Sequence, residues 1–435
     1  MKRKDHTYAL DHSAIIHLAA RRKNHTNVFR IEMTLKEPVD HKILQKALDN
    51  IARCFPTVIA GIQKGFWNYR IVPAKATPTV KKETSCLRVM SETEIQNCAF
   101  RVLYQGKRIA VEFFHSLTDG HGGMVVTTSL VAEYLRLKYG IKIPDSKFVL
   151  QKECNIQIET KDDYMRFAGK KGMIPKYKPS FQLPKRSEIN HNMKRTCYEY
   201  RVLEVLQLAH DYGVSVTTLL AALILQSVME IQKTQPDRKK REQTVQIMIP
   251  IDLRRLFHSG TLRNFSFFAL CGMEPQEEEI PFEQILQTVD TQLNSQNTAT
   301  FMEKTIAGQV KTANFPVYKY LPLPIKMWVL RFVQEVCGEN NSCISVSNLG
   351  TVSLPKAMEE QVERIVFTLS PRRKSSHNCS VVSYNEKLSV MFSKSCEGTE
   401  LENIFSKNLK TIFQKHSIDK SLTKPTYNSN INKNK

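Results

Sequence analysis

Hydrophobic and polar positions alternate along the chain in a way that predicts interleaved strands and helices. The run 28–35 alternates around Phe29, Ile31 and Met33, which is the two-residue period of a strand. Asp40 is placed to cap the helix that follows, because apolar residues then recur on one helical face between 43 and 52. The same patterns predict strands at 66–72 and 108–114, and a helix over 123–139 that ends at Gly140.

The second half of the chain continues this alternation. The segment 217–231 is apolar nearly all round, which predicts a buried central helix, and Ser215 is placed to cap it. Apolar residues at helical spacing predict further helices over 282–293 and 401–413. Short alternating runs predict strands at 197–203, 246–251, 344–346, 364–369, 380–384 and 388–393.

Two segments lack such periodicity and divide the chain. Residues 166–195 contain prolines and many lysines, so we interpret them as a connection between an N-terminal lobe, 1–165, and a C-terminal lobe, 196–415. The final residues, 416–435, are mostly Lys, Asn, Ser and Thr and predict a disordered polar tail. Strands and helices mixed through two lobes of similar size indicate an α/β fold.

The composition narrows the class of protein. Of the 435 residues, 41% are hydrophobic and 24% are charged, as in a globular protein with a full core. No apolar run reaches the roughly 18 residues of a membrane span, and His17 interrupts the apolar stretch 14–20, which argues against a signal peptide. The ten cysteines lie far apart without metal-ligand spacing, so buried thiols are expected rather than disulfides or a zinc site. We therefore expect a cytoplasmic protein without a metal.

The formal net charge is +21, from 63 Lys and Arg against 42 Asp and Glu. Such a charge is compatible with nucleic acid, an anionic membrane or a polyanionic small molecule as the partner. Basic residues cluster at 170–178, 185–194, 233–241 and 372–374, but aromatic residues are not interleaved with them as on a base-stacking surface. We expect no nucleic-acid partner, and a solvated lysine-rich surface is the favoured interpretation of the charge.

One short segment combines residue types that suit acid–base chemistry. His115, Asp119 and Gly120 lie where a predicted strand ends and a helix begins. Histidine can accept a proton near neutral pH and return it, and a carboxylate four residues later can fix the loop. Gly120, with Gly122 and Gly123, suits close approach by a ligand. The alternative is a loop histidine that caps a helix or binds a carbonyl group.

Three segments together resemble a known family. His-Ser-Leu-Thr-Asp-Gly at 115–120 resembles the active-site motif of the CoA-dependent acyltransferase superfamily, which includes chloramphenicol acetyltransferase, the plant BAHD acyltransferases, alcohol acetyltransferases and condensation domains. Ile-Pro-Ile-Asp-Leu-Arg at 249–254, followed by Arg-Asn-Phe at 263–265, resembles a segment of the family's second lobe. Ser-Asn-Leu-Gly at 347–350 resembles a strand of the alcohol acetyltransferase and condensation branches. The chain is most similar to the bacterial alcohol acetyltransferases.

The chain departs from the family pattern in two places, which bear on its activity and on the branch of the family that it resembles. Many relatives carry a further histidine directly before the catalytic one, where this chain has Phe114. The catalytic histidine itself is kept as His115, so the resemblance still implies activity. The Asp-Phe-Gly-Trp-Gly motif of the plant enzymes is absent, which argues against that branch.

The resemblance implies an architecture and a set of roles. It implies two chloramphenicol-acetyltransferase-like lobes, with mixed sheets and flanking helices, that meet at an active-site tunnel. His115 would take the proton from an acceptor hydroxyl or amine and then protonate the departing thiolate. Asp119 would hold the loop through an arginine, for which Arg254 is the candidate and Arg255 the lesser one.

Several further candidate positions remain, and some of them have two interpretations. Ser347 and Asn348 would supply an oxyanion donor from the opposite lobe, or they are turn residues. Asn264 would pin the second-lobe loop, and Gly120 with its neighbouring glycines would leave room for the pantetheine arm or the acyl group. The other histidines, such as His121 and His377, are expected to be surface or loop residues. The apolar segment 328–336 predicts a helix of the core or tunnel wall, with membrane contact as the lesser alternative.

The resemblance predicts an acyltransferase that moves an acyl group, expected to be acetyl, from acyl-CoA to an acceptor hydroxyl. The predicted partners are acyl-CoA as co-substrate and a small-molecule acceptor, with no tightly bound cofactor, and the chain is expected to work as a monomer. One alternative is a condensation-like enzyme that forms amides from an acyl group bound to a carrier protein. Another is a non-catalytic relative that binds a hydrophobic ligand or a partner protein, although the presence of His115 counts against it.

Overall fold

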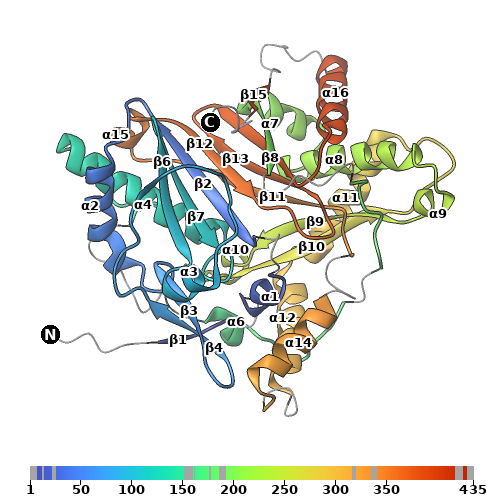
Figure 1. Ribbon diagram of the computed structural model, residues 1–435. Helices are drawn as coiled ribbons and strands as arrows, with labels where there is room; N and C mark the ends of the chain where they lie inside the picture. Colours follow the sequence, from blue (N-terminus) through green and yellow to red (C-terminus); the bar gives the residue numbers. More distant parts are fainter. Residues whose placement is uncertain are drawn as a thin grey trace.

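The computed structural model describes residues 7–11, 14–21, 26–150, 160, 162–175, 178–185, 193–315, 320–334, 340–416 and 425–428. They form three β-sheets with helices packed against them (Figure 1). The blue and cyan elements of the first half lie on one side of the molecule, and the green, yellow and orange elements of the second half lie mainly on the other. The predicted α/β class is therefore confirmed.

The first sheet has five strands in the order β12-β2-β7-β6-β5. Their bounds are Val362–Leu369, Val28–Leu35, Arg108–Phe114, Phe100–Gln105 and Lys81–Lys82. Two helices, α2 (His41–Ile51) and α4 (Gly120–Tyr139), pack on each other, and α4 also packs on β2. Asp40 caps α2 by accepting hydrogen bonds from Lys42 N and Ile43 N, as the sequence predicts. Gly140 ends α4 at a φ of 69°, a conformation that favours glycine.

The second sheet has seven strands in the order β10-β9-β11-β13-β14-β8-β15. Their bounds are Ser266–Met273, Val245–Asp252, Ile344–Thr351, His377–Tyr384, Lys387–Lys394, Lys194–Arg201 and Pro425–Asn428. The buried helix α8 (Val216–Lys233), capped by Ser215, contacts β9 and packs against α11 (Phe282–Gln296), α16 (Glu400–Lys415) and α7 (Val202–Asp211). The all-round apolar character of the sequence between 217 and 231 thus correctly predicts a central helix.

Smaller elements surround these two layers. A three-stranded sheet has the order β1-β4-β3, with bounds Tyr8–Ala9, Tyr69–Pro73 and Ala60–Lys64. The short helices of the first half are α1 (Ala14–Ala19), η1 (Ala52–Cys54), α3 (Glu92–Asn97) and α6 (Asp163–Arg166). The other helices of the second half are α9 (Arg238–Arg241), α10 (Arg254–Phe257), α12 (Ala299–Asn314), α14 (Leu323–Val333) and α15 (Lys356–Glu359).

Strand β12 joins the two halves of the chain. It lies within the predicted C-terminal lobe, 196–415, yet it pairs antiparallel with β2 of the first sheet. Its other side meets the second sheet, where the Ser380 hydroxyl donates to the Phe367 carbonyl oxygen at 2.9 Å and the Tyr384 hydroxyl donates to the Val362 carbonyl oxygen at 3.0 Å. The chain order therefore does not separate the two sheets cleanly, because β12 completes the edge of the first.

Three sequence predictions need correction. The strand expected at 197–203 ends at Arg201, because Val202 begins α7. The strand expected at 66–72 begins only at Tyr69, because Phe66 and Trp67 lie in the turn that joins β3 to β4. Within the predicted disordered tail, residues 425–428 form β15, which pairs with β8. An edge strand presents unpaired backbone N–H and C=O groups, so a polar segment can pair with β8 through its backbone without apolar side chains. Residues 417–424 and 429–435 lie outside the described residues.

In the described part of the chain, no single helix is long and apolar enough to cross a membrane. Only α7 and α8 taken together are long and apolar enough, and they meet at a bend of 84°. The eight cysteines among the described residues are free thiols, and five of them are buried. Cys154 and Cys337 lie outside the described residues.

A buried ionic cluster connects the two sheets. The Arg30 guanidinium on β2, fully buried, contacts Glu32 at 2.5 Å, Glu83 at 2.7 Å and Glu112 at 3.1 Å. Glu32 also pairs with Arg195, which lies on β8 of the second sheet. Burial alone raises the pKa of Glu32, but the neighbouring arginines outweigh it and hold that pKa well below its ordinary value.

We predict that Arg30→Leu destabilises the protein by about 3 kcal/mol or more, because removing one member of a buried ion cluster leaves the remaining carboxylates uncompensated. Urea unfolding followed by circular dichroism measures the change. Arg238→Ala, which removes an exposed ion pair with Glu242, is the control and should leave the unfolding midpoint unchanged. Equal midpoints for Arg30→Leu and the parent protein would contradict a structural role for the cluster.

Candidate active site

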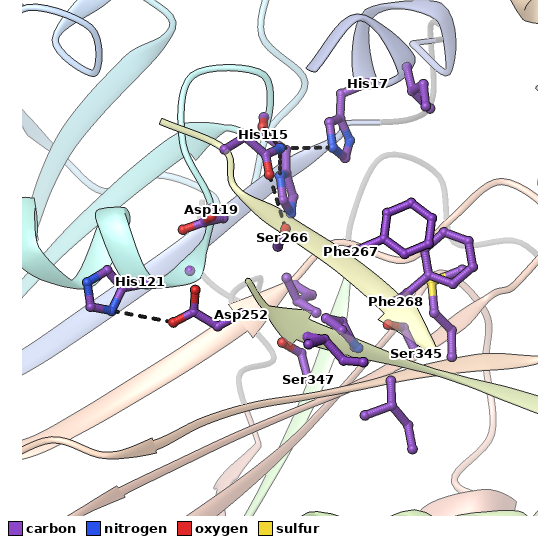
Figure 2. A pocket seen from close by; sticks show the side chains of 18 of the residues that line it. His17, His115, Asp119, His121, Asp252, Ser266, Phe267, Phe268, Ser345 and Ser347 are labelled. Atoms are coloured by element: carbon purple, nitrogen blue, oxygen red, sulfur yellow. Dashed lines mark hydrogen bonds and ion pairs between the residues drawn. The ribbon is translucent and has the colours of Figure 1, made fainter. Parts of the chain in front are cut away.

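A cavity of about 1540 Å³ is lined by residues from both halves of the chain (Figure 2). The first half contributes three histidines, His17, His115 and His121. The second half contributes the facing wall, which includes Ser266 on β10 and Ser347 on β11. The two principal sheets thus supply opposite walls of one cavity.

His115 stands directly after the last residue of β7. Its backbone N–H donates to the Asn27 carbonyl oxygen at 2.9 Å. The loop that follows is held at both sides: the Ser116 hydroxyl donates to the Ala14 carbonyl oxygen at 2.8 Å, and the Thr118 hydroxyl donates to the Leu262 carbonyl oxygen at 2.6 Å. The position of His115 therefore depends on the strand before it and on contacts to both halves of the chain.

A second imidazole, His17 of α1, lies against His115. The two rings are stacked, with centroids 4.2 Å apart and planes inclined by 12°. Phe29 approaches the His115 ring edge-on at 5.2 Å. The stacked pair lines the cavity wall, so His115 is held between an aromatic ring of β2 and the imidazole of α1.

Asn264 connects the two imidazoles from the second half of the chain. Its Nδ2 atom donates to the His115 carbonyl oxygen at 2.9 Å and lies 3.3 Å from both His115 Nδ1 and His17 Nε2. Its Oδ1 atom accepts a hydrogen bond from the Ser266 hydroxyl at 3.1 Å. The residue predicted to pin the second-lobe loop thus contacts the histidine directly.

Both imidazoles favour the neutral form. Shielding from water lowers the pKa of His115, while a hydrogen bond to its own backbone carbonyl and the Asp119 carboxylate act in the opposite direction. The same shielding, with His115 nearby, lowers the pKa of His17 well below its ordinary value. His115 is therefore an unprotonated imidazole at neutral pH, as a general base needs to be.

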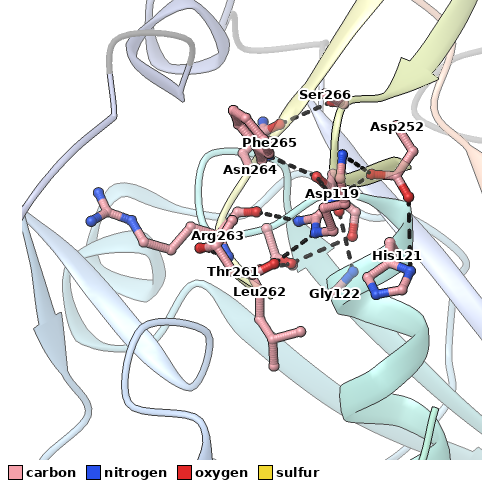
Figure 3. A network of polar contacts seen from close by, with 12 residues as sticks. Asp119, His121, Gly122, Asp252, Thr261, Leu262, Arg263, Asn264, Phe265 and Ser266 are labelled. Atoms are coloured by element: carbon pink, nitrogen blue, oxygen red, sulfur yellow. Dashed lines mark hydrogen bonds and ion pairs between the residues drawn. The ribbon is translucent and has the colours of Figure 1, made fainter. Parts of the chain in front are cut away.

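Asp119 ties the His115 loop to the second half of the chain (Figure 3). Its carboxylate accepts from Arg254 Nη1 at 2.8 Å, from Phe265 N at 2.8 Å and from Gly122 N at 3.2 Å. The last of these contacts caps α4. Burial alone raises the pKa of Asp119, but its contact with Arg254 outweighs this and lowers it, so the carboxylate stays ionised.

Arg254 is the partner that the sequence analysis proposed for Asp119. Besides Asp119, its guanidinium donates to Asp252 at 2.9 Å, the Thr261 carbonyl at 2.6 Å and the Arg263 carbonyl at 2.6 Å. The side chain is buried, whereas the lesser candidate, Arg255, is exposed at the cavity. These hydrogen bonds are made inside the protein, so the Asp119–Arg254 pair joins the His115 loop to the second half of the chain.

Protein groups pack closely against the glycines of the motif. A Cβ atom on Gly120 would lie 2.5 Å from Leu349 Cδ2, and one on Gly122 would lie 2.4 Å from the Leu262 carbonyl oxygen. At Gly123 it would lie 2.6 Å from the ring of Phe29. Close packing explains Gly122 and Gly123, whereas Gly120 also lines the cavity, so the predicted room for a ligand arm stays a prediction for Gly120.

Ser347 and Asn348 both lie on β11 but make different contacts. The side chain of Asn348 donates to the Thr217 hydroxyl at 3.0 Å and accepts from Gly350 N at 2.8 Å, which is the behaviour of a turn residue. Ser347 lines the cavity from β11, on the wall opposite His115 (Figure 2). Asn348 lines the cavity too, but its amide group is bonded to Thr217 and Gly350, so Ser347 stays the candidate hydrogen-bond donor.

Two other histidines differ from the expectation of surface or loop residues. His121, in the first turn of α4, lines the cavity, and its Nδ1 lies 4.0 Å from Asp252 Oδ2. His377 is buried at the start of β13 and is not among the cavity-lining residues. Burial lowers its pKa to about 3. Local sequence does not distinguish these environments, because both depend on the packing of distant segments.

Basic side chains at the cavity come from only part of the predicted clusters. Two residues of the predicted clusters, Lys178 and Arg372, line the cavity. Lys147 and Arg255 also line it, but they lie outside the clusters. The cluster 233–241 contributes no residue to the cavity wall. Among the described residues, no group of three or more His, Cys, Asp or Glu side chains could hold a metal ion.

Comparisons with known proteins identify the fold. No family model matches the sequence, and no curated protein matches it. F. graminearum TRI101, complexed with coenzyme A and deoxynivalenol, aligns with a TM-score of 0.61 at 10% identity, over 94% of this chain and 98% of that one. The condensation domain of the Monacolin K polyketide synthase MokA aligns with a TM-score of 0.57 at 11% identity, over 96% and 99%. The wax ester synthase/diacylglycerol acyltransferase of Marinobacter aquaeolei VT8 aligns with a TM-score of 0.56 at 9% identity, over 94% and 100%.

The chain has the fold of CoA-dependent acyltransferases and condensation domains. The alignments cover nearly the whole of this chain and of each neighbour, so the two-lobed acyltransferase fold includes both sheets. This confirms the fold that the three sequence segments imply.

Within this acyltransferase fold, His17 is the site residue that sequence reasoning missed. The position before His115 is Phe114, so the motif itself contains one histidine. A second imidazole nevertheless reaches the site from α1, almost a hundred residues earlier in the chain. One signal was available: His17 is the single polar residue in the apolar stretch 14–20.

We predict that His17→Ala raises the pKa of His115 toward its ordinary value of 6.5, because removing the stacked ring admits water to His115. NMR titration of the histidine ring signals measures this pKa directly. His210→Ala, at an exposed position on α7, is the control and should leave it unchanged. An unaltered His115 pKa in folded His17→Ala would show that His17 does not shield it.

Proposed function

We propose that this protein is an acyltransferase that moves an acyl group, acetyl in the simplest case, from acyl-CoA to an acceptor hydroxyl. The observation that carries the proposal is the neutral, protein-shielded imidazole of His115 at a cavity between two sheets. The fold supports it, because neighbours with this fold include a coenzyme A complex and an acyltransferase. Acyl-CoA acts as a co-substrate, and the chain works as a monomer because both cavity walls come from one chain.

His115 acts as the general base through Nε2. This role requires the tautomer with its proton on Nδ1, the ring nitrogen nearer the backbone, because Nε2 is then free to accept a proton. Nε2 then removes the proton from the acceptor hydroxyl as the acceptor oxygen attacks the thioester carbonyl carbon. When the tetrahedral intermediate collapses, the carbon–sulfur bond breaks, and His115 returns the proton to the thiolate of CoA.

The other site residues position this base or stabilise charge. Asn264 and His17 hold the ring of His115, and the Asp119–Arg254 pair fixes the loop on which it stands. The Ser347 hydroxyl is the proposed donor to the oxyanion, from the opposite wall. Lys147, Arg255 and Arg372 line the cavity, and their charges suit the phosphates of CoA, which a guanidinium or ammonium group binds well. Arg372 also donates to the Ser342 hydroxyl at 2.6 Å.

We predict that His115→Ala lowers acceptor-dependent release of free CoA by about 10²–10⁴-fold, since this is the usual contribution of a positioned base. Purified protein is supplied with acetyl-CoA or longer acyl-CoAs and a panel of alcohols and amines, and the free thiol is measured. His210→Ala is the control with an exposed histidine removed. Circular dichroism checks folding, and equal release by folded His115→Ala would exclude His115 as the base.

The pH dependence provides a second prediction. Because the pKa of His115 is lowered, the imidazole is neutral above that pKa and protonated below it. The value of kcat/KM should therefore fall as the pH decreases through a midpoint below 6.5, and should be level above it. Rates measured over a pH series with a saturating donor test this, and a midpoint above 6.5 would contradict a shielded base.

A condensation-like enzyme is the second candidate, because a condensation domain aligns with this chain almost as well as the coenzyme A complex does. In that case the acyl donor is a thioester on a carrier protein and the product is an amide. Adding a carrier-bound acyl group and amine acceptors to the same assay separates the two. Loss of activity in His115→Ala is expected for both, so the preferred donor decides between them.

A further inference from the structure

Helix α14 has an exposed apolar face. Ile325, Trp328 and Phe332 recur at helical spacing on one side, and Trp328 and Phe332 are 68% and 59% exposed. The opposite side is packed in the protein, where Leu323 and Met327 join a core cluster with residues of α1 and β4. Large aromatic side chains gathered on one exposed face mark an interaction surface rather than ordinary scatter.

The turn between β3 and β4 extends this face. Phe66, 70% exposed, and Trp67 lie at its tip, with their rings 4.6 Å apart. The turn is bonded to α14: Leu323 N donates to the Phe66 carbonyl oxygen at 3.1 Å, and Lys326 Nζ donates to the Trp67 carbonyl oxygen at 3.1 Å. Both elements lie at the same end of the molecule in Figure 1. We call Phe66, Trp67, Ile325, Trp328 and Phe332 together the aromatic patch.

Exposed basic side chains lie beside the aromatic patch. Arg331 is exposed on α14, next to Phe332, and Arg70 is exposed on β4, which follows the turn. Lys64, before the turn, is paired with Glu92, and Lys326 is buried with its ammonium group bonded to the turn. The two arginines therefore give the surface beside the patch positive charge, on a chain whose formal net charge is +21. The partner that complements such a surface presents negative charge above an apolar layer.

The aromatic patch lies on the outside of the cavity wall. Leu330 and Val333 of α14 line the cavity, together with Ile16 and Ile174, which are themselves exposed. The same helix thus faces the cavity with one side and solvent with the other. An apolar molecule held at the patch is therefore one helix away from the cavity.

We propose that the aromatic patch docks this protein on an anionic lipid bilayer. Tryptophan and other aromatic rings favour the headgroup region, where one part of the ring is apolar and another polar, and basic residues are attracted to anionic lipids. A bilayer fits better than a protein, because the exposed face of α14 offers apolar rings next to the exposed guanidinium group of Arg331, with few neutral side chains that could form hydrogen bonds to a specific partner. This inference goes beyond the proposed function and does not depend on acyl transfer.

The sequence supplies a built-in probe of the patch. It contains two tryptophans, Trp67 and Trp328, and both lie in the aromatic patch, so intrinsic tryptophan emission reports on this surface alone. The full-length protein is mixed with vesicles of equal amounts of phosphatidylcholine and phosphatidylglycerol, or of phosphatidylcholine alone. We expect a blue shift with the anionic vesicles, quenching when the phosphatidylcholine is brominated, and a smaller effect at high salt.

A pair of double variants tests which surface binds. Trp328→Ala with Phe332→Ala should lower the partition coefficient for the anionic vesicles, measured by co-sedimentation, about tenfold or more. Leu203→Ala with Leu206→Ala is the matched control, because these residues are equally exposed apolar side chains on α7, at the other end of the molecule (Figure 1). The control should bind as the parent protein does.

Three outcomes would overturn the proposal. In the first, anionic vesicles neither shift nor quench the tryptophan emission. In the second, the Trp328→Ala, Phe332→Ala protein still sediments with the vesicles. In the third, an acidic carrier protein changes the emission and vesicles do not. Binding is measured without acyl-CoA, and His115→Ala should bind vesicles normally. Failure of lipid docking is therefore distinguishable from failure of the acyltransferase proposal.

Discussion

One buried carboxylate, that of Asp119, holds the parts of the candidate site together. Asp119 caps α4, pairs with Arg254 and accepts from the backbone of Phe265, so it joins the His115 loop to the segment that carries Asn264. Each contact fixes a different part of the site: the helix behind the loop, the second half of the chain, and the residue that touches the imidazole. A carboxylate can accept several hydrogen bonds at once, which no neutral side chain of its size matches. The paired guanidinium offsets the cost of burying its charge.

This constraint creates a protected place for an imidazole. His115 is held by Phe29, His17 and Asn264, and none of these groups carries a charge. Charged groups near the site, Asp119 and Arg254, are bonded to each other and to the backbone instead of to the ring. The surroundings of the imidazole thus keep it neutral, while the Asp119–Arg254 pair holds the loop in place. The separation of the two roles explains why the motif needs both a histidine and an aspartate.

The two sheets are connected at several levels. Strand β12 completes the first sheet while its backbone oxygens accept from side chains of the second, and the Arg30 cluster reaches across to Arg195. The cavity lies where these sheets face each other. The outer side of the same region carries the aromatic patch, which places an apolar surface beside the cavity rather than elsewhere on a basic protein.

Sequence alone determined the features that depend on neighbouring residues. Periodicity located β2, β7, α2 and α8 closely, and capping residues marked where α2 and α8 begin, because these signals repeat over a few residues. The resemblance to the acyltransferase superfamily also paired the motif around His115 with the segment containing Arg254. These parts of the fold and site were therefore predictable.

Only the tertiary structure decided features that join distant segments. Nothing in the sequence near Phe114 indicates that α1 brings His17 onto His115, or that β12 leaves its own half of the chain to pair with β2. The glycines after Asp119 suggested room for a ligand, yet groups from elsewhere in the fold pack against Gly122 and Gly123. For α14 the sequence predicted an apolar helix but not which face is covered. Burial is decided by what packs against a residue, and that partner is set by the whole fold rather than by local pattern.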